Sequence, residues 1–582
     1  MLSKSQIETL HITEKFLSMI KCPDSSCKKL NYLMVLPKQA DDSSQYTFPT
    51  GFGIVSASLK ASGRTVYTLN LTYKDNPLEL LKTTINKYTI DVVLTGGLSG
   101  QYSLLREIID VVKQIRPDIT VIVGGGIITA EPDVAMQALE NADYGVIGEG
   151  EITLNDLCYA LESGNDVKKV DGLIIKSGDG KYLMTSPREE IADLDCLPFP
   201  DYDGLDYIEV FDRKFSGTGI IKNVGVVIIS SRSCPYNCTF CFHSSGKKYR
   251  RRSLDVVFQE LDLLKEKYPI DFIQVADELF GNDIAYVREF CTRIKSYGVH
   301  YRISTRIDRV TDELLGLLKD SGCEEILFGV EHISNIILKS MNKKTSSALL
   351  EPTLRKCLQY GIRPVGNIIF GDLAETEDTV NEALDWWREH RSLGNITTTY
   401  LIVFPGSYVY KVACERGIIS DPVQYLRDGC PLINITTMSD SKWAEMKDLI
   451  AINRILYETD AEPVGSEQIS ETLDRLAEYN SVCVWPATHD SIRFFKSFSE
   501  KFSQNTYFVN INPDSQMLRT TDVYTHIYSP QIISEKNIKL VICPRYSLLE
   551  QIRTICANDF PSVKRVVSIQ DLGNLEVEEL LK

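Results

Sequence analysis

The feature that most constrains the fold is an alternation of short apolar runs with longer amphipathic stretches. It recurs in three successive series, over residues 31–163, over residues 224–436 and from residue 481 onward. Strands that alternate with helices form parallel sheets covered by helices, so each series predicts an α/β domain. The chain has 582 residues, which also requires several domains, because single hydrophobic cores stop growing at ~250–300 residues.

The first series predicts a doubly wound parallel sheet over residues 31–165. Its apolar runs are YLMVLP, TVYTLNL, DVVLTGG, TVIVGGG and DYGVIGEGE. Ligands of such sheets bind at the carboxyl ends of the strands, where glycines let a bulky ligand chain lie against the sheet edge. Three successive ends carry the candidate ligand-binding residues, namely Thr95, Gly96 and Gly97, then Gly124, Gly125 and Gly126, then Gly148, Glu149 and Gly150. A generic nucleotide or flavin fold with tight turns is the alternative.

The second series predicts a barrel, or part of one, over residues 223–438. Its strand candidates are GVVIISS, DFIQVAD, YRISTR, EILFGVE, RPVGNIIFG and TTTYLIVFP. Barrels of βα units carry their chemistry at the C-terminal ends of the strands. Residues 166–222 read as a connector, because GLIIKSGDGKYLMTS has the pattern of a hairpin around a Gly-Asp-Gly turn.

The remaining segments predict a helical extension over residues 1–30, a helical linker over 439–479 and a small Rossmann-like α/β domain over 480–582. The last contains no G-x-G-x-x-G fingerprint, so we expect it to dock a substrate or partner rather than to bind a nicotinamide. His489 is expected to be a surface or capping residue.

Composition narrows the classes of partner. The formal net charge is −16, which argues against a nucleic-acid ligand, because affinity for phosphate backbones rests on Lys and Arg. No apolar run approaches the ~20 residues of a membrane span, and the start has no cleavage site typical of a signal peptide. We therefore expect a cytoplasmic protein whose 15 cysteines are reduced core residues or metal ligands.

One group of cysteines lies in the loop that follows the first strand of the second series. Cys234, Cys238 and Cys241 have the spacing C-x3-C-x2-C. Thiolates hold iron–sulfur clusters, and three ligands leave one iron free to bind a substrate or cofactor. Two alternatives remain: a zinc site, with His243 as a fourth ligand, and chance clustering of free thiols.

The stretch CPYNCTFC, with Phe240 just before the third cysteine, resembles the signature of the radical S-adenosylmethionine (SAM) enzymes. The resemblance implies that the three thiolates hold a [4Fe–4S] cluster whose unique iron binds SAM. It also implies reductive cleavage of SAM to a 5′-deoxyadenosyl radical. The basic run KKYRRRS behind the loop is similar to a stretch of the cobalamin-containing branch, or is a solvated patch.

The same resemblance implies a set of SAM contacts near the ends of the later strands. They are Asp277 and Glu278 near the amino group, Arg306 at the carboxylate, Glu331 on the fourth strand, and Gly366 and Gly371 of GNIIFG near the adenine. The stretch GDLAET departs from the family's G-x-P-G-E-T. Glu375 and Thr376 match it, although either residue is also suited to cap the following helix.

The glycine-ended strands of the first series, in their order ahead of the cysteine loop, resemble the cobalamin-binding domain of the same branch. One departure is clear: no His occurs between Asn31 and Arg232, so the imidazole that ligates cobalt in many cobalamin domains is missing. Similar radical SAM proteins also hold cobalamin without it. The expected architecture is α/β, with a doubly wound cobalamin-binding domain, a partial (β/α)6 radical SAM barrel and a small C-terminal Rossmann-like domain.

The resemblance implies a cobalamin-dependent radical SAM enzyme, and the reaction we expect is methyl transfer to an unactivated carbon. Cyclisation or rearrangement is the first alternative, and a metal-stabilised binding protein without activity is another. A tRNA methylthiotransferase is disfavoured, because the cysteines ahead of residue 234 form no second triad. Expected partners are a small-molecule substrate, such as a natural-product, lipid or sugar precursor, and an electron donor such as flavodoxin or ferredoxin, with no nucleic acid and no membrane span.

Overall fold

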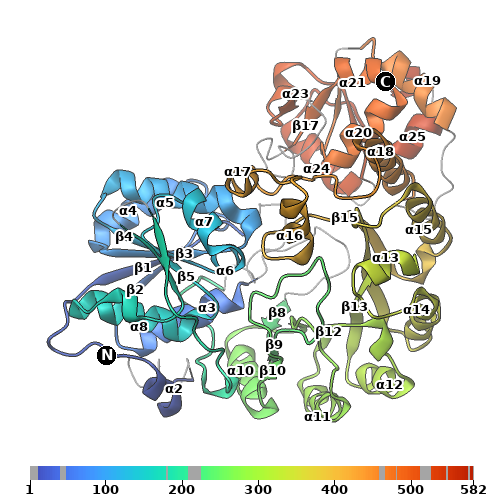
Figure 1. Ribbon diagram of the computed structural model, residues 1–582. Coiled ribbons are helices and arrows are strands. Elements are labelled where there is room, and N and C mark those ends of the chain that lie inside the picture. Colours follow the sequence, from blue (N-terminus) through green and yellow to red (C-terminus); the bar gives the residue numbers. More distant parts are fainter. Residues whose placement is uncertain are drawn as a thin grey trace. The chain divides into compact units, whose positions relative to one another are not determined.

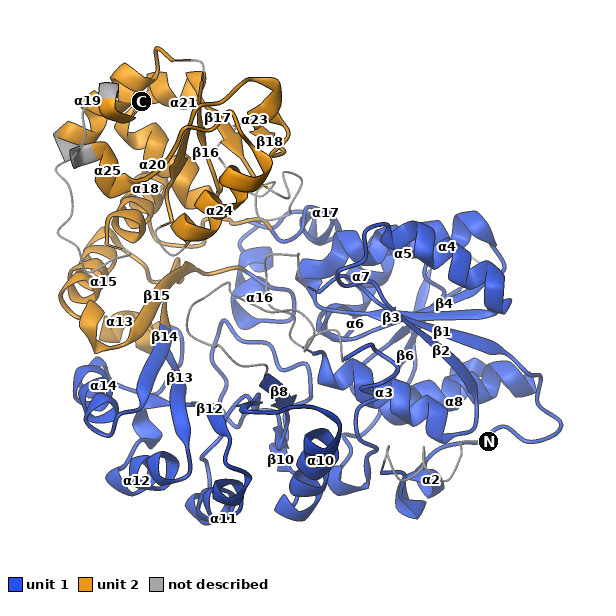
Figure 2. Ribbon diagram, turned by 180° about the vertical axis from the view of Figure 1, so that it is seen from behind, with its two compact units in different colours: residues 1–330, 341–366, 403–430 blue, residues 331–340, 367–402, 431–582 orange. Residues whose placement is uncertain are grey.

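The structure of the chain, a computed structural model, describes residues 11–39, 48–177, 181–207, 225–457, 466–479, 481–510, 526–545, 548–574 and 577–580. The chain divides into two compact units (Figure 2). Unit 1 comprises residues 1–330, 341–366 and 403–430, and unit 2 comprises residues 331–340, 367–402 and 431–582. Among the described residues, none of the helices has the length and apolar character that a membrane span requires.

The first sheet is doubly wound, as the sequence predicts. Its strand order is β2-β1-β3-β4-β5-β6-β7. The first five strands, β1 (Asn31–Leu36), β2 (Thr65–Asn70), β3 (Val92–Gly96), β4 (Thr120–Gly124) and β5 (Tyr144–Val146), are parallel. In Figure 1, helices α4 (Pro77–Tyr88), α5 (Tyr102–Ile115) and α7 (Pro132–Ala138) cover one face, and α3 (Thr50–Ala61) and α8 (Gly150–Ser163) cover the other. α6 (Gly126–Ala130) follows β4.

The predicted hairpin of the connector is present. β6 (Leu173–Lys176) pairs antiparallel with β5 and with β7 (Tyr182–Met184), so the hairpin extends the first sheet. Its Gly-Asp-Gly tip, residues 178–180, lies outside the described residues. Within residues 11–30 the predicted helical extension amounts to α2 (Glu14–Met19) alone.

The second sheet contains all six predicted strands. They are β8 (Gly225–Ile228), β11 (Phe272–Val275), β12 (His300–Thr305), β13 (Cys323–Glu331), β14 (Arg363–Phe370) and β15 (Asn395–Tyr400), in the order β15-β14-β13-β12-β11-β8. The pairings β8–β11, β11–β12 and β12–β13 are parallel. A sequential parallel order is that of a partial barrel.

Helices follow the strands of this sheet in turn. They are α10 (Leu254–Lys267), α11 (Ile284–Ile294), α12 (Asp312–Asp320), α13 (Asn335–Ser340), α14 (Leu350–Gln359), α15 (Glu377–Glu389), α16 (Tyr408–Glu415) and α17 (Pro422–Arg427). Ser253, Asp283, Thr311 and Thr376 cap four of them, each side chain accepting a hydrogen bond from a backbone N–H of the first turn. These caps explain why the helices begin where the strand-end loops stop.

The C-terminal part is Rossmann-like, as predicted. α18 (Asp440–Leu456) and α19 (Ser466–Leu476) precede a parallel sheet of order β18-β17-β16-β19-β20. Its strands are β16 (Val482–Val484), β17 (Tyr507–Val509), β18 (Ile527–Tyr528), β19 (Leu540–Cys543) and β20 (Arg565–Ser568). Its helices are α20 (His489–Phe498), α21 (Glu500–Asn505), α23 (Ile532–Glu535), α24 (Leu549–Asp559), α25 (Ile569–Asn574) and α26 (Val577–Leu580).

His489 does not cap α20, and its side chain is only partly exposed. Thr488 caps α20, and His489 is the first helical residue. Its side chain is only 16% exposed, and its Nε2 lies 3.2 Å from Arg493 Nε.

Candidate functional site

The carboxyl ends of β3 and β4 approach each other so closely that they require glycine. A Cβ on Gly96 would lie 2.6 Å from the carbonyl oxygen of Gly124. Gly125 has φ +86°, and a Cβ on it would lie 2.8 Å from the carbonyl oxygen of Gly97. Residues with a side chain rarely adopt that φ, so both the close approach and the backbone conformation require glycine here.

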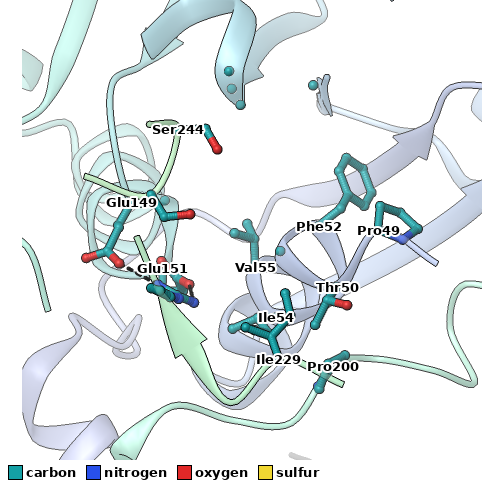
Figure 3. A pocket seen from close by; sticks show the side chains of 18 of the residues that line it. Pro49, Thr50, Phe52, Ile54, Val55, Glu149, Glu151, Pro200, Ile229 and Ser244 are labelled. Carbon is teal, nitrogen blue, oxygen red and sulfur yellow. Dashed lines mark hydrogen bonds and ion pairs between the residues drawn. The ribbon is translucent and has the colours of Figure 1, made fainter. Parts of the chain in front are cut away.

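In front of the sheet is a cavity of about 470 Å³ within unit 1, and all nine predicted ligand-binding residues line it. Figure 3 shows its apolar wall, to which Pro49, Phe52, Ile54 and Val55 contribute from the start of α3. Residues from the segments that follow β8 and β11 also line the cavity, among them Ile229, Ser231, Arg232, Ser244 and Glu278. The glycine loops and the chain flanking the cysteine loop therefore share one cavity.

The cysteine loop is fixed at its base by a short antiparallel ribbon. β9 (Ser231–Arg232) pairs with β10 (Arg250–Arg251), which brings together the two ends of the loop. Ser233, with φ +68°, is buried and donates from Oγ to the carbonyl oxygen of Gly246 at 2.7 Å. This positive φ at a serine turns the chain sharply just before the first cysteine.

The middle of the loop is held by backbone bonds within the same unit. The N–H of Thr239 donates to the carbonyl oxygen of Met341 at 3.0 Å, and the N–H of Val409 donates to the carbonyl oxygen of Thr239 at 3.0 Å. Asn342 Nδ2 donates to the carbonyl oxygen of Asn237 at 2.7 Å. The loop between the cysteines is thus supported from two other parts of the chain.

The three thiols of this loop are accessible. Cys241 is exposed and Cys234 and Cys238 are half-buried, whereas singly placed cysteines such as Cys158 and Cys323 are buried. Partial burial raises the pKa of the Cys234 thiol. In the part of the chain that the structure describes, no three His, Cys, Asp or Glu side chains converge as ligands of a single metal ion. Accessible thiols on one supported loop fit the donor chemistry of an iron–sulfur cluster.

His243 is engaged by other residues of the protein. Its Nδ1 lies 3.2 Å from Glu278 Oε2, and its Nε2 lies 3.0 Å from the carbonyl oxygen of Tyr236. The hydrogen bond and charge of Glu278 raise the pKa of His243, with burial opposing them. Both ring nitrogens therefore have partners within the protein, and the structure gives no support to His243 as a zinc ligand.

Two of the predicted SAM contacts are engaged within the protein. Asp277 is buried and accepts hydrogen bonds from the backbone N–H and the hydroxyl of both Ser230 and Ser231. Arg306 is buried, pairs with Asp308 at 2.8 Å and lies 3.8 Å from the centre of the Tyr236 ring. Asp277 thus anchors the chain that leads into the cysteine loop, and Arg306 supports the loop itself.

The remaining predicted SAM contacts have the following positions. Glu278 lines the cavity, and Gly366 lies in β14 within unit 1. In unit 2, Glu331 is the last residue of β13 and has φ +64°. Gly371 has φ +108°, and a Cβ on it would lie 3.2 Å from the ring of Trp443. Their contacts with SAM stay predictions.

Thr376 and Glu375 have separate structural roles in unit 2. Thr376 caps α15 by accepting from the N–H of Thr379 at 3.2 Å. Glu375 is fully buried, accepts from the N–H of Gly371 at 3.0 Å and lies 3.4 Å from His332 Nε2. The glutamate that matches the family pattern therefore holds the turn after β14.

A group of buried ion pairs escaped the sequence analysis. Glu149 pairs with Arg232 at 2.6 Å and with Arg250 at 2.9 Å, and Glu151 pairs with Arg232 at 2.6 Å. Burial raises the pKa of Glu149, but the charge of Arg232 and the hydrogen bonds from both arginines outweigh burial and lower it overall. The available signal was the position of two glutamates between a buried strand and the following helix, where buried carboxylates require partners.

Comparisons with known proteins agree with this architecture. The family model of the B12 binding domain matches residues 40–158, and that of the radical SAM superfamily matches residues 228–386. An uncharacterized methyltransferase of Pyrococcus horikoshii is 28% identical over 340 residues, which cover 58% of this chain and 72% of that protein. The anaerobic magnesium-protoporphyrin IX monomethyl ester cyclase of Rubrivivax gelatinosus is 26% identical over 351 residues, 58% of this chain and 62% of that protein.

The fold is also that of a solved structure. The cobalamin-dependent S-adenosylmethionine radical enzyme OxsB, with aqua-cobalamin and S-adenosylmethionine bound, superposes with a TM-score of 0.61 at 17% identity, covering 82% of this chain and 71% of that chain. The match to the radical SAM model favours an iron–sulfur cluster rather than zinc at the cysteine loop. The match to the B12-binding model favours cobalamin rather than a nucleotide or flavin at the first sheet. The chain therefore has a radical SAM domain preceded by a B12-binding domain, and these two domains imply a [4Fe–4S] cluster, SAM and cobalamin as its cofactors.

Proposed function

We propose that this enzyme transfers a methyl group from cobalamin to an unactivated carbon of a small molecule. The observation that carries the proposal is the cavity, because its walls include the glycine loops of the B12-binding sheet and residues that flank the cysteine loop. When bound, the cluster and SAM supply a 5′-deoxyadenosyl radical that abstracts a substrate hydrogen, and cobalamin supplies the methyl group.

In this proposal, Cys234, Cys238 and Cys241 hold the cluster, and the nine residues of the three glycine-rich strand ends hold cobalamin. The apolar wall around Phe52 and Val55 would help to keep water away from the bound cofactors. Exclusion of water protects a radical from side reactions. The chain thus positions two reactive groups and shields the space between them.

The two arginines that line the cavity are already paired, which favours a cofactor or substrate without a strong negative charge of its own. Arg232 is paired with Glu149 and Glu151, and Arg252 is paired with Glu260. Side chains whose charges are already neutralised contribute little to the recognition of a charged ligand. We propose a natural-product, lipid or sugar precursor as the class of substrate. We also propose flavodoxin or ferredoxin as the electron donor. The cytoplasmic location stays a prediction from the sequence.

A second candidate function is radical cyclisation without methyl transfer. The similarity to a cyclase favours it, and the same cofactors serve both reactions. The two candidates differ only in the fate of the substrate radical.

The test is a reaction of the anaerobically reconstituted enzyme with SAM labelled in its methyl group, a reductant, cobalamin and candidate substrates. Methyl transfer predicts 5′-deoxyadenosine together with a product that is heavier by the labelled methyl group. Formation of 5′-deoxyadenosine with a product that lacks the label would refute methyl transfer and support cyclisation. The matched control is a variant in which the three loop cysteines are alanine, which should form neither product.

A further inference from the structure

We propose that Glu149 is a positioning residue that couples the cobalamin cavity to the cluster loop through Arg232. The occupancy of each cofactor site would then change the affinity of the other. This inference rests on the two cofactors, and it holds whether the reaction is methyl transfer or cyclisation.

The first step is the position of Glu149. It lies between Gly148 and Gly150, directly after β5, and these three residues line the cavity. Figure 3 shows Glu149 and Glu151 close together at one side of the cavity. A ligand in the cavity would therefore contact the segment that carries the Glu149 carboxylate.

The second step is that this carboxylate is fully used by the protein. Its Oε1 accepts from Arg232 NH1 at 2.6 Å, and both oxygens accept from Arg250 NH1 at 2.9 Å. Its Oε2 also accepts from the backbone N–H of Ile191 at 2.6 Å. Since both oxygens are satisfied, Glu149 acts on the site by holding other residues rather than by a side-chain bond to cobalamin.

The third step is what the two arginines hold. Arg232 and Arg250 are directly opposite each other in the β9–β10 ribbon, and the chain between them contains the three cluster cysteines. Arg232 stands two residues before Cys234 and uses its second terminal nitrogen for Glu151 at 2.6 Å. One carboxylate of the B12-binding sheet is thus bonded to both ends of the cluster loop.

The fourth step is the stiffness of this connection. The side chains of Glu149, Glu151 and Arg232 are 7%, 3% and 12% exposed, so water does not substitute for a lost partner. A buried charge that loses its partner is strongly unfavourable. A displacement of residues 148–150 is therefore transmitted to the base of the cluster loop, and coupling between two sites is reciprocal.

The test measures the dissociation constant of hydroxocobalamin for the full-length protein in two states, with the cluster reconstituted and after its removal by a chelator. We expect the two constants to differ by at least about fivefold, the lower end of typical coupling between sites. In Glu149→Gln, which keeps the shape but weakens the bonds to both arginines, the ratio should fall to about one.

Glu162→Gln is the matched control. Glu162 forms a buried pair with Arg64, whose Nε and NH2 lie 2.8 Å from its two oxygens, and neither residue lines the cavity. This variant should keep the wild-type ratio even if its melting temperature falls. Should Glu149→Gln fail to fold, Arg232→Lys takes its place, because a single ammonium cannot span Glu149 and Glu151 as the guanidinium fork does.

A spectroscopic measurement separates positioning from a general loss of stability. Addition of cobalamin should change the electron paramagnetic resonance spectrum of the reduced cluster in the wild type and in Glu162→Gln, but not in Glu149→Gln. Equal constants in both wild-type states, or a wild-type ratio in folded Glu149→Gln and Arg232→Lys, would overturn the coupling. A wild type that binds no cobalamin in either state would overturn the cofactor assignment as well.

Discussion

Asp277 offers the sharpest test of how the cluster loop is built, because its anchoring role and its predicted SAM contact lead to different results. The carboxylate accepts from the N–H of Ser230 at 2.6 Å and of Ser231 at 3.1 Å, and from their hydroxyls at 2.6 and 2.7 Å. In Asp277→Ala, the two buried N–H groups lose their acceptor. At ~1–3 kcal/mol for each unsatisfied group, we expect a loss of about 2–6 kcal/mol in the free energy of unfolding.

Asp277→Asn should behave differently. The amide oxygen still accepts from both N–H groups, and the serine hydroxyls can rotate to accept from the amide nitrogen. We expect this variant to lose about 1 kcal/mol, the worth of an ordinary hydrogen bond, and to keep its affinity for SAM.

The assays are thermal unfolding followed by circular dichroism and equilibrium binding of SAM to the reconstituted enzyme under anaerobic conditions. For Asp277→Ala the melting temperature should fall by at least ~4 °C, at ~2 °C per kcal/mol for a large domain. The reasoning is refuted if Asp277→Asn melts like the wild type but no longer binds SAM, because the carboxylate would then contact the cofactor rather than the serines.

Three further predictions test other parts of the site. Gly125→Ala should abolish cobalamin binding, because its Cβ would lie 2.8 Å from the Gly97 carbonyl oxygen. The control is Gly63→Ala, which has a similar φ of +84° but no atom within 4 Å of the new Cβ. It should lower the free energy of unfolding by only the ~1–3 kcal/mol of backbone strain and leave cobalamin binding unchanged. Alanine at all three loop cysteines should remove the iron, the sulfide and the brown absorbance, whereas Cys414→Ala should retain them. Gly371→Ala should lower the melting temperature without changing cluster content, because its Cβ would lie 3.2 Å from Trp443. A loss of iron in this variant would contradict this expectation.

The fold was predictable from the sequence because its signals are local. Strands such as β4 and β11 are short buried apolar runs, and the helices between them begin at polar caps, so the two periodicities separate within a few residues. The glycine ends of β3, β4 and β5 were identifiable for the same reason. Their convergence on one cavity follows from the parallel order of the strands.

The connections between distant residues were not predictable. Glu149 and Arg232 are 83 residues apart, and neither position has a pattern that designates its partner. Arg250 belongs to a basic run that is also typical of a solvated patch, yet its side chain is 8% exposed. Asp277 shows the same limit, since an acidic residue after a strand suggests a ligand contact, whereas the two serines that donate to it lie 47 and 46 residues earlier in the chain.

The interleaving of the two units has a consequence for synthesis of the protein. Unit 1 is completed only by residues 403–430, and among these Val409 supplies an N–H that binds the carbonyl oxygen of Thr239 in the cysteine loop. At ~5–20 residues per second, Val409 is translated roughly 10 to 30 s after Cys241. During that interval the thiols of the nascent chain lie on a loop without this support, and accessible thiols are the ones most readily oxidised. Expression in air is therefore expected to damage the protein before folding ends, and low oxygen during translation should raise the yield of protein that accepts a cluster.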